Sequence, residues 1–265
     1  MPSVLIDGLA LHYELSGPAD GAPLLLSNSL ASDLHMWDDQ VEALHAAGFR
    51  VLRYDNRGHG LSAPPAGPLS IERLADDVVA LLDHLGWDAV HYCGLSLGGM
   101  IGQMLARRHG RRLRSLLLAD TAAHMGPPSL WDERIAAVEQ GGMAAVVEAT
   151  LGRWFTAAAH AGMTHAAAIA RVRGAILATS PAGFCACSVA IRDMDQRGGL
   201  ATIDLPTLVV VGAEDPSTPL AAAELLHARI AGSRLVVLPD AAHLANIEQA
   251  AAFNAAMLEF LGHLP

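Results

Sequence analysis

Val90-His-Tyr-Cys-Gly-Leu-Ser-Leu-Gly-Gly99 is the stretch that decides the fold of this chain. It begins as a short apolar run, typical of a buried strand, and the residues from Met100 onward have helical spacing. The G-x-S-x-G pattern at Gly94, Ser96 and Gly98 therefore falls on a strand-to-helix turn. This is the context of a nucleophile elbow, in which glycines leave room for a strained turn that exposes the serine. We predict that Ser96 is a nucleophile; the alternative is an ordinary glycine-rich turn.

Asp215 and His243 are the predicted partners of Ser96. A serine nucleophile needs a base to accept its proton and an acid to orient that base. On a strand–turn–helix scaffold these partners follow the serine in the order acid, then histidine. Asp215 lies just beyond one apolar run, and His243 lies in the loop after the next run, before a final helix predicted over residues 247–261. Asp120 also ends a predicted strand and is the alternative acid.

Acyl transfer at a serine also needs hydrogen-bond donors for the developing oxyanion. The backbone N–H of Leu97 is the first predicted donor, because this residue follows the nucleophile. The polar loop Ser27-Asn-Ser-Leu-Ala-Ser-Asp33 follows an early predicted strand and should supply the second. We assign that donor to the N–H of Leu30; the alternative is that this loop is a simple turn.

Predicted strands and helices alternate along most of the chain, which indicates an α/β fold with a mostly parallel sheet of about eight strands flanked by helices. Residues 1–15 contain an Asp-Gly turn between two short apolar alternations and should form an opening β-hairpin. Residues 121–200 break the alternation with alanine-rich helical segments. We therefore predict a core formed by residues 1–120 and 201–265, with 121–200 as a helical cap over the strand ends.

Composition excludes several classes of protein. The 17 basic residues are all arginine, and the absence of lysine rules out a P-loop NTPase, a Schiff-base aldolase and a pyridoxal-phosphate enzyme. A net charge of −10 without a basic run argues against binding to nucleic acid or an anionic membrane. Three cysteines and a start without a basic, apolar leader predict reduced thiols and a cytoplasmic protein. Cys185 and Cys187 are expected to be buried thiols rather than metal ligands.

The chain resembles the α/β-hydrolase superfamily over nearly its full length and, more narrowly, the 3-oxoadipate enol-lactonases. The elbow and the Arg-Gly-His-Gly segment at residues 57–60 mark only the superfamily. Narrower matches are Ser27-Asn-Ser-Leu30, Arg153-Trp-Phe-Thr156 and Ala190-Ile-Arg-Asp-Met-Asp195. Two departures are Ala31, where that family usually has glycine, and Leu97, where it usually has methionine. Both departures keep a backbone N–H, so the oxyanion hole should survive.

The resemblance implies a serine hydrolase in which Ser96, Asp215 and His243 are nucleophile, orienting acid and base. Ser96 would attack the lactone carbonyl, an enolate would leave and become a ketone, and water would hydrolyse the acyl-enzyme to give 3-oxoadipate. No metal or organic cofactor is required. A serine at the elbow argues against the haloalkane dehalogenase and epoxide hydrolase branches, whose nucleophile is a carboxylate.

An enol-lactone substrate of this kind carries a free carboxylate, which needs a local positive charge in an acidic protein. Residues 121–200 contain six arginines and six acidic residues, so the whole net charge of −10 lies elsewhere. Trp131 and Arg134 are spaced i, i+3 and should share one helix face. We predict that both, together with Trp154, bind substrate; the alternatives are a solvated Arg134 and tryptophans that only pack in the core.

The same sequence features fit several other functions. A carboxylesterase, a C–C bond hydrolase and a cofactor-free perhydrolase would use the same triad, because pocket walls rather than the triad set specificity. A non-catalytic ligand-binding protein of the same fold is the alternative from another class, although it would be expected to lack a triad member. The sequence does not indicate an oligomeric state.

Overall fold

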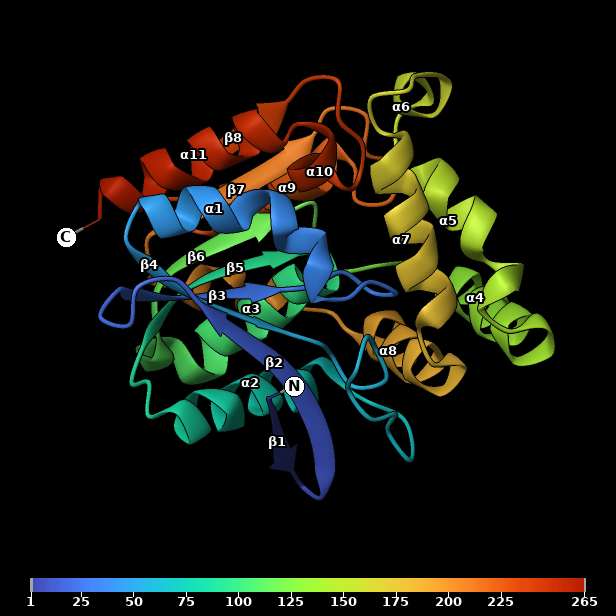
Figure 1. The fold of residues 1–265 in the computed structure, drawn as a ribbon, viewed down its shortest axis with the longest axis horizontal. Coiled ribbons are helices and arrows are strands. Elements are labelled where there is room, and N and C mark those ends of the chain that lie inside the picture. The colour runs from blue at the N-terminus through green and yellow to red at the C-terminus, as the bar shows by residue number, and fades with distance from the viewer. Residues whose placement is uncertain (1, 265) are drawn as a thin grey trace.

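A computed structural model describes residues 2–264 and contains one eight-stranded sheet (Figure 1). Its strands are β1 (Ser3–Ile6), β2 (Leu9–Ser16), β3 (Ala22–Ser27), β4 (Phe49–Tyr54), β5 (Val90–Leu95), β6 (Leu113–Ala119), β7 (Thr207–Gly212) and β8 (Arg234–Leu238). Their spatial order is β1-β2-β4-β3-β5-β6-β7-β8. The pairs β1–β2 and β2–β4 are antiparallel, whereas every other neighbouring pair is parallel. The predicted α/β class, mostly parallel sheet and opening hairpin are confirmed, with Met1 outside the described residues.

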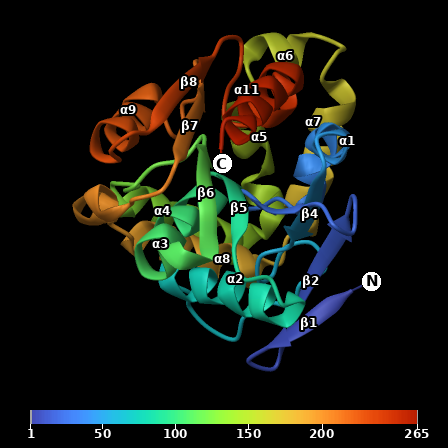
Figure 2. The ribbon, with the colours of Figure 1, turned by 90° about the vertical axis from the view of Figure 1, so that its left-hand side faces the viewer.

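Helices cover both faces of the sheet. On one face α1 (Asp38–Ala46) packs against α11 (Ala250–Gly262), and on the other α2 (Ile71–Leu85) packs against α3 (Leu97–His109), as Figures 1 and 2 show. Helix α9 (Leu220–Arg229) packs on β7 and β8. Because both faces are covered, parallel strands such as β5 are buried along their whole length.

Residues 121–200 contain five α-helices and no strand, and we call this segment the helical insertion. Its helices are α4 (Pro128–Gly141), α5 (Val147–Trp154), α6 (Ala157–Ala161), α7 (Ala166–Ala178) and α8 (Pro181–Asp193). They lie at the carboxyl ends of the parallel strands, on the right in Figure 1. Gly183 of α8 meets Gly58 of the core so closely that a Cβ on either would overlap the other's backbone, and Ser180 N donates to Gly58 O at 2.9 Å.

The final helix differs from the prediction of one helix over residues 247–261. A short helix, α10 (Ala245–Glu248), is followed by Gln249, whose backbone (φ −122°, ψ 48°) is not helical, and α11 begins at Ala250. The apolar periodicity of the segment hides this break. Its physical reason is that the side chain of Glu248 turns inward, where it forms buried hydrogen bonds instead of lying on an exposed helix face.

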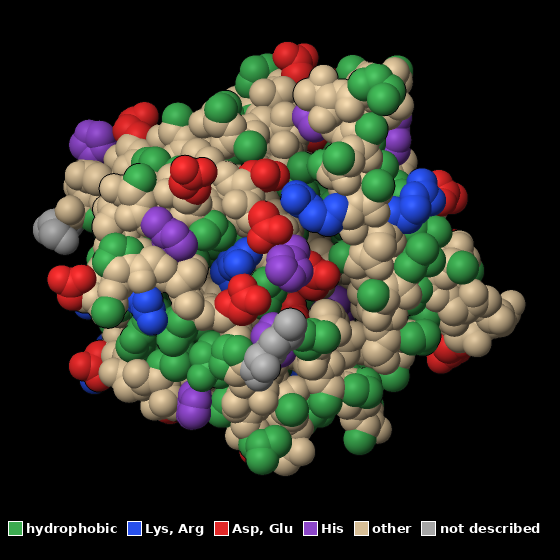
Figure 3. Space-filling view, viewed as in Figure 1, with side chains coloured by type: hydrophobic (Ala, Val, Ile, Leu, Met, Phe, Trp, Pro, Cys, Tyr) green, Lys and Arg blue, Asp and Glu red, His purple; other side chains and the backbone are tan. Residues whose placement is uncertain are grey.

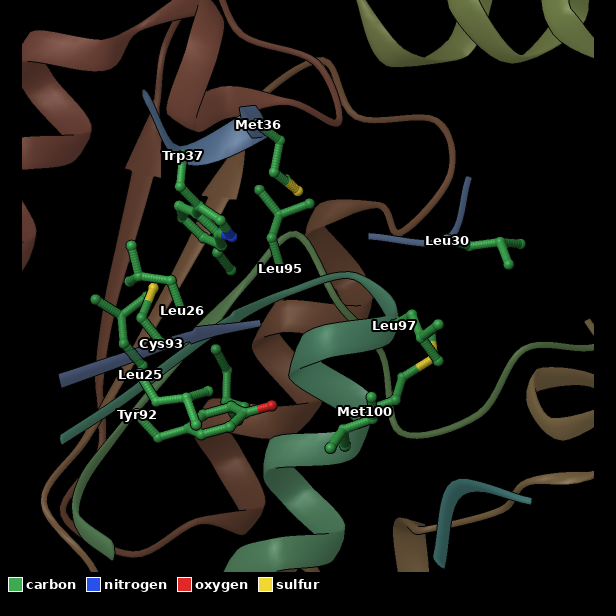
Figure 4. Close-up of a cluster of buried hydrophobic side chains, with 14 of the residues drawn as sticks. Leu25, Leu26, Leu30, Met36, Trp37, Tyr92, Cys93, Leu95, Leu97 and Met100 are labelled. Carbon is green, nitrogen blue, oxygen red and sulfur yellow. The ribbon is translucent and has the colours of Figure 1, made fainter. Parts of the chain in front are cut away.

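The core is continuous from the sheet to the first turns of α3. Figure 4 shows leucines of β3 with Tyr92 and Cys93 of β5, and the same cluster includes Leu97 and Met100 of α3. The strand end that carries the elbow is therefore held in densely packed surroundings. A fixed backbone at that point can hold a strained residue.

Charged side chains of both signs are mixed on the face seen in Figure 3. Elsewhere in the described chain, Arg53 forms ion pairs with both Glu14 and Asp38. No single helix within residues 2–264 is long and apolar enough to cross a membrane, although α7 and α8, which meet at 95°, reach that length and hydropathy together.

His59 should make the stability of the fold depend on pH. Burial lowers the pKa of this histidine from 6.5 to about 4, although its Nδ1–H donates to Arg57 O at 3.0 Å. Below pH 6.5, His59 therefore binds a proton in the unfolded chain but stays unprotonated in the folded chain until the pH nears 4. We expect the free energy of unfolding to fall by about 3 kcal/mol from this residue between pH 6.5 and 4. Urea unfolding of the wild type and His59→Gln checks this, since parallel losses in both proteins would contradict it.

Candidate active site

Ser96 lies on a strained turn between β5 and α3, with φ 55° and ψ −113°. Positive φ is costly for a serine and persists only where its surroundings enforce it. A Cβ at Gly94 would overlap the backbone of Gly98, and a Cβ at Gly98 would overlap Ser27 O, so this turn requires both glycines. Ser96 N donates to Ala119 O at 2.9 Å, which ties the turn to β6.

Asp215 and His243 form a buried, hydrogen-bonded pair. His243 Nδ1 donates to Asp215 Oδ2 at 2.8 Å. Asp215 also accepts from Ser217 N at 2.7 Å and from Thr218 Oγ1 at 2.6 Å. Burial opposes its charge, but the neighbouring His243 and these hydrogen bonds hold its pKa below the ordinary value. An ionised carboxylate in this place fixes the ring orientation and leaves Nε2 as the proton acceptor.

Asp120, the alternative acid, differs from Asp215 in its hydrogen-bond partners. Its Oδ1 accepts from Gly212 N at 2.8 Å, and no hydrogen bond to its Oδ2 is found within residues 2–264. Burial and the nearby Asp215 raise the pKa of Asp120 well above its ordinary value. The structure therefore places Asp215, and not Asp120, against His243.

Two backbone amides beside Ser96 are available to a ligand. Among the described residues, neither Leu30 N nor Leu97 N donates a hydrogen bond, whereas the adjacent Gly98 N donates to Asn28 O at 3.0 Å. Leu97 begins α3, and the first amides of a helix have no partner inside it. Figure 4 shows both leucines near the carboxyl ends of the central strands. These amides can serve a bound oxyanion.

The loop that carries Leu30 is held from several sides. Asn28 Nδ2 donates to Tyr54 O at 2.7 Å, and Trp37 Nε1 donates to Asn28 Oδ1 at 3.0 Å. Ala31 has φ 58°, in the left-handed region that favours glycine. This conformation explains why glycine is usual at this position in the enol-lactonases that the sequence resembles.

One cavity connects these groups to the helical insertion. The space between its walls is about 710 Å³, part of which is open to solvent. Its wall from the core includes Ser29, Leu30, Ala31, Ser96, Met100, Ser217, Thr218 and His243. Its wall from the insertion includes Met125, Trp131, Arg134, Ala145, Val146, Ala149, Thr150, Arg153, Trp154, Phe184 and Ile191. Ser96 and His243 make no hydrogen bond to each other within the described structure, but both face this cavity, and such contacts often tighten only when substrate binds.

All three predicted substrate-binding residues lie in the cavity wall. Arg134 Cζ sits 4.6 Å from the centre of the Trp131 ring, as their i, i+3 spacing predicts. The Trp154 and His243 rings are 6.1 Å apart and inclined by 34°. Trp154 therefore contacts the active site directly in addition to packing in the core.

Comparison with known proteins places the chain in a family. The sequence model described as "alpha/beta hydrolase fold" matches residues 22–250. The chain belongs to the alpha/beta hydrolase family. It is 37% identical over 249 residues to 3-oxoadipate enol-lactonase 2 of Acinetobacter baylyi, covering 94% of this chain and 92% of that protein.

Two further relatives of this alpha/beta hydrolase carry different names. A crystal structure of the enol-lactonase from Burkholderia xenovorans has a TM-score of 0.95 and 40% identity, covering 99% of this chain and 100% of that one. A putative carbamate hydrolase, RutD, of Variovorax paradoxus is 35% identical over 262 residues, covering 97% of both chains. The fold and the resemblance predicted from sequence are confirmed.

Arg153 is a cavity residue of this alpha/beta hydrolase that sequence reasoning did not assign. Burial and the nearby Arg134 lower its pKa to about 10, so it remains charged at neutral pH. Neither arginine forms an ion pair within residues 2–264, whereas the insertion's other arginines pair with acidic residues: Arg171, Arg173, Arg192 and Arg197. The signal in the sequence was the position of Arg153 directly before Trp154, which is predicted to bind substrate; the structure adds that Thr150, three residues earlier, also lines the cavity.

The cysteines play no part in this site. Cys187 is buried, as expected, but Cys185 is only partly buried because it lies beside a surface groove between α4 and α8. Burial raises the pKa of both thiols. No group of three or more His, Cys, Asp or Glu side chains within residues 2–264 is placed to hold a metal ion.

Proposed function

We propose that this alpha/beta hydrolase opens the ring of 3-oxoadipate enol-lactone by acyl transfer to Ser96. The observation that carries the proposal is that His243, hydrogen-bonded to Asp215 behind it, lines one cavity together with an elbow serine and two arginines that form no ion pair among the described residues. The elbow and the pair support a serine hydrolase, and the arginines favour a substrate with a carboxylate. The enol-lactonase names of two relatives agree with both features.

Acylation begins when His243 Nε2 takes the proton of Ser96 Oγ and Oγ attacks the ring carbonyl carbon. The carbonyl oxygen becomes an oxyanion, for which the free N–H groups of Leu30 and Leu97 are the donors. Asp215 holds the imidazole through Nδ1 and stabilises its positive charge. Collapse of the intermediate breaks the bond between the acyl carbon and the ring oxygen.

The leaving group of this reaction remains attached to the acyl chain, because the substrate is a ring. It departs as an enolate, which takes a proton and becomes a ketone. His243 then removes a proton from water, hydroxide attacks the ester carbonyl, and Ser96 recovers its proton. The net change is the addition of one water molecule across one C–O bond, which gives 3-oxoadipate.

We propose that the helical insertion acts as a cap that binds the substrate carboxylate. Arg134 and Arg153 lie 19 positions apart in sequence and line the same cavity without an acidic partner among the described residues. Two guanidinium groups in a partly buried cavity repel each other, and a carboxylate between them would relieve this repulsion. The guanidinium of Arg134 lies over the Trp131 ring, and Trp154 forms the wall next to His243.

Truncating either arginine should weaken catalysis on the lactone selectively. We expect Arg134→Ala and Arg153→Ala to lower kcat/KM for the lactone by roughly 10-fold to 150-fold, which corresponds to about 1.5 to 3 kcal/mol for a hydrogen bond to a charged group. The loss on a neutral ester should be much smaller. Arg197→Ala is the matched control, since Arg197 belongs to the insertion but pairs with Asp195. Equal losses on charged and neutral substrates would give the two arginines a structural role only.

A panel of lactones and p-nitrophenyl esters tests the reaction class. Preference for neutral esters would indicate a carboxylesterase. Cleavage of a C–C bond in a diketone would indicate a C–C hydrolase, and formation of a peracid from peroxide would indicate a perhydrolase. Turnover of a carbamate would favour the reaction named for the RutD relative. Ligand binding without any turnover would indicate a non-catalytic member of the fold.

Two further expectations belong to this proposal. The substrate is a small molecule, and no role for nucleic acid or a membrane is proposed. A cytoplasmic location is favoured by three cysteines without a disulfide among them.

A further inference from the structure

Glu248 is a buried carboxylate that the proposed reaction does not use. It ends α10 with a side chain that is almost completely buried, and it accepts three hydrogen bonds. Thr156 N and Thr156 Oγ1 donate to Oε1 at 2.9 and 2.8 Å, and Ala242 N donates to Oε2 at 2.6 Å. No arginine or histidine within residues 2–264 forms an ion pair with it. Its charge is therefore balanced by two backbone amides and one hydroxyl.

These hydrogen bonds join the helical insertion to the loop that carries His243. Thr156 caps α6 and lies two residues after Trp154, which lines the cavity. Ala242 directly precedes His243, and on its other side Leu244 N donates to Trp154 O at 3.1 Å. Both neighbours of the histidine are thus linked to the segment of the insertion that faces it.

The backbone of α10 adds a further link. His165, which directly precedes α7, donates from Nε2 to Glu248 O at 3.2 Å. The helix break at Gln249, which accompanies the inward turn of the carboxylate, leaves this carbonyl available to His165. Glu248 therefore contacts the start of α6, the start of α7 and the histidine loop at once.

A carboxylate suits this position better than an amide. Each of its oxygens only accepts, and all three groups that surround it are donors. Glutamine has the same shape, but its Nε2 would face a donor on one side and leave that donor without an acceptor. Such a mismatch is costly in a buried place.

We propose that Glu248 is a positioning residue that fixes the His243 imidazole against Trp154 and Ser96 by tying Thr156 and Ala242 to one carboxylate. The inference rests on the proposed function in that His243 serves as the base. It gives the segment 154–156, of which Trp154 lines the cavity, a second role, because the placement of this segment sets the orientation of a catalytic ring. A misplacement of about 1 Å at such a ring can lower a rate by about 100-fold.

Glu248→Gln and Thr156→Val test the link from its two sides. We expect each to lower kcat by roughly 10-fold to 100-fold while KM stays within about threefold, because binding groups remain and only the base moves. The double variant should lose hardly more than the worse single variant, because both changes break the same link. Thr156→Ser keeps the hydroxyl donor and should retain nearly the wild-type rate. Labelling of Ser96 by a neutral fluorophosphonate should slow in parallel with kcat.

Thr179→Val is the matched control, since Thr179 is a buried threonine of the same insertion whose hydroxyl donates to Ala175 O at 2.9 Å, away from the histidine loop. It should change thermal stability without changing kcat. Unchanged kcat in Thr156→Val, additive losses in the double variant, or a rise in KM alone would overturn the proposal, even if Glu248→Gln failed to fold. A wild type inactive on every lactone and ester would instead contradict the proposed function.

Discussion

Ser96→Ala should abolish nearly all hydrolysis of the lactone while the protein stays folded. Removing Oγ leaves no atom to form the acyl-enzyme, so kcat should fall by on the order of 10⁴-fold to 10⁶-fold. Residual turnover would come from binding and the amides of Leu30 and Leu97. Steady-state kinetics measure the loss, and circular dichroism checks the fold.

Labelling with a fluorophosphonate distinguishes loss of the nucleophile from loss of activity through a disturbed structure. The reagent should label the wild type at Ser96 alone, as located by peptide mass spectrometry, and should not label Ser96→Ala. Ser70→Ala is the control, since Ser70 caps α2 through its side chain and lies outside the cavity wall. Labelling at another serine, or full activity of Ser96→Ala, would show that Ser96 is not the nucleophile.

Asp215→Asn should have the second largest effect, about 10⁴-fold on kcat. Its Oδ2 accepts the hydrogen bond from His243 Nδ1 at 2.8 Å, and an amide would favour the wrong tautomer of the ring. KM should change little, because Asp215 is not in the cavity wall. Stopped-flow acylation with a chromogenic ester measures the step that requires the base.

Asp120→Asn is the matched control for Asp215→Asn. Both aspartates are buried and follow strand ends, but Asp120 makes no hydrogen bond to His243, and asparagine keeps the acceptor for Gly212 N. We expect its kcat within about threefold of the wild type. If Asp120→Asn lost more activity than Asp215→Asn, the acid would be misassigned although the reaction class would stand.

The elbow and the strand ends could be predicted from sequence because local rules act there. Gly94 and Gly98 are required by backbone contacts within and next to one turn, and a parallel strand such as β5, buried along its whole length, is mostly apolar. Parallel strands bring their carboxyl ends to one edge of the sheet, which is why residues as distant in sequence as Ser96, Asp215 and His243 can meet there. Their order along the chain is the one expected for a strand–turn–helix hydrolase scaffold. These features need no knowledge of distant packing.

The inner face of the helical insertion could be predicted only in part. Spacing placed Trp131 and Arg134 on one face, but it could not show that Arg153 lacks an acidic partner, because ion pairs form between helices distant in sequence. The role of Glu248 could not be predicted for the same reason, since its hydrogen-bond partner Thr156 is 92 positions away in the sequence. The break at Gln249 likewise depends on where Glu248 finds its donors.

The ratio of kcat/KM for 3-oxoadipate enol-lactone to kcat/KM for the same ring without its carboxylate tests the central claim most directly. The wild type should prefer the acidic lactone by at least about 10-fold, the lower limit for one hydrogen bond to a charged group. The preference should nearly vanish in Arg134→Ala/Arg153→Ala. A wild type that hydrolyses the neutral ring equally well or better would contradict the assignment of this cavity to a carboxylate-bearing lactone.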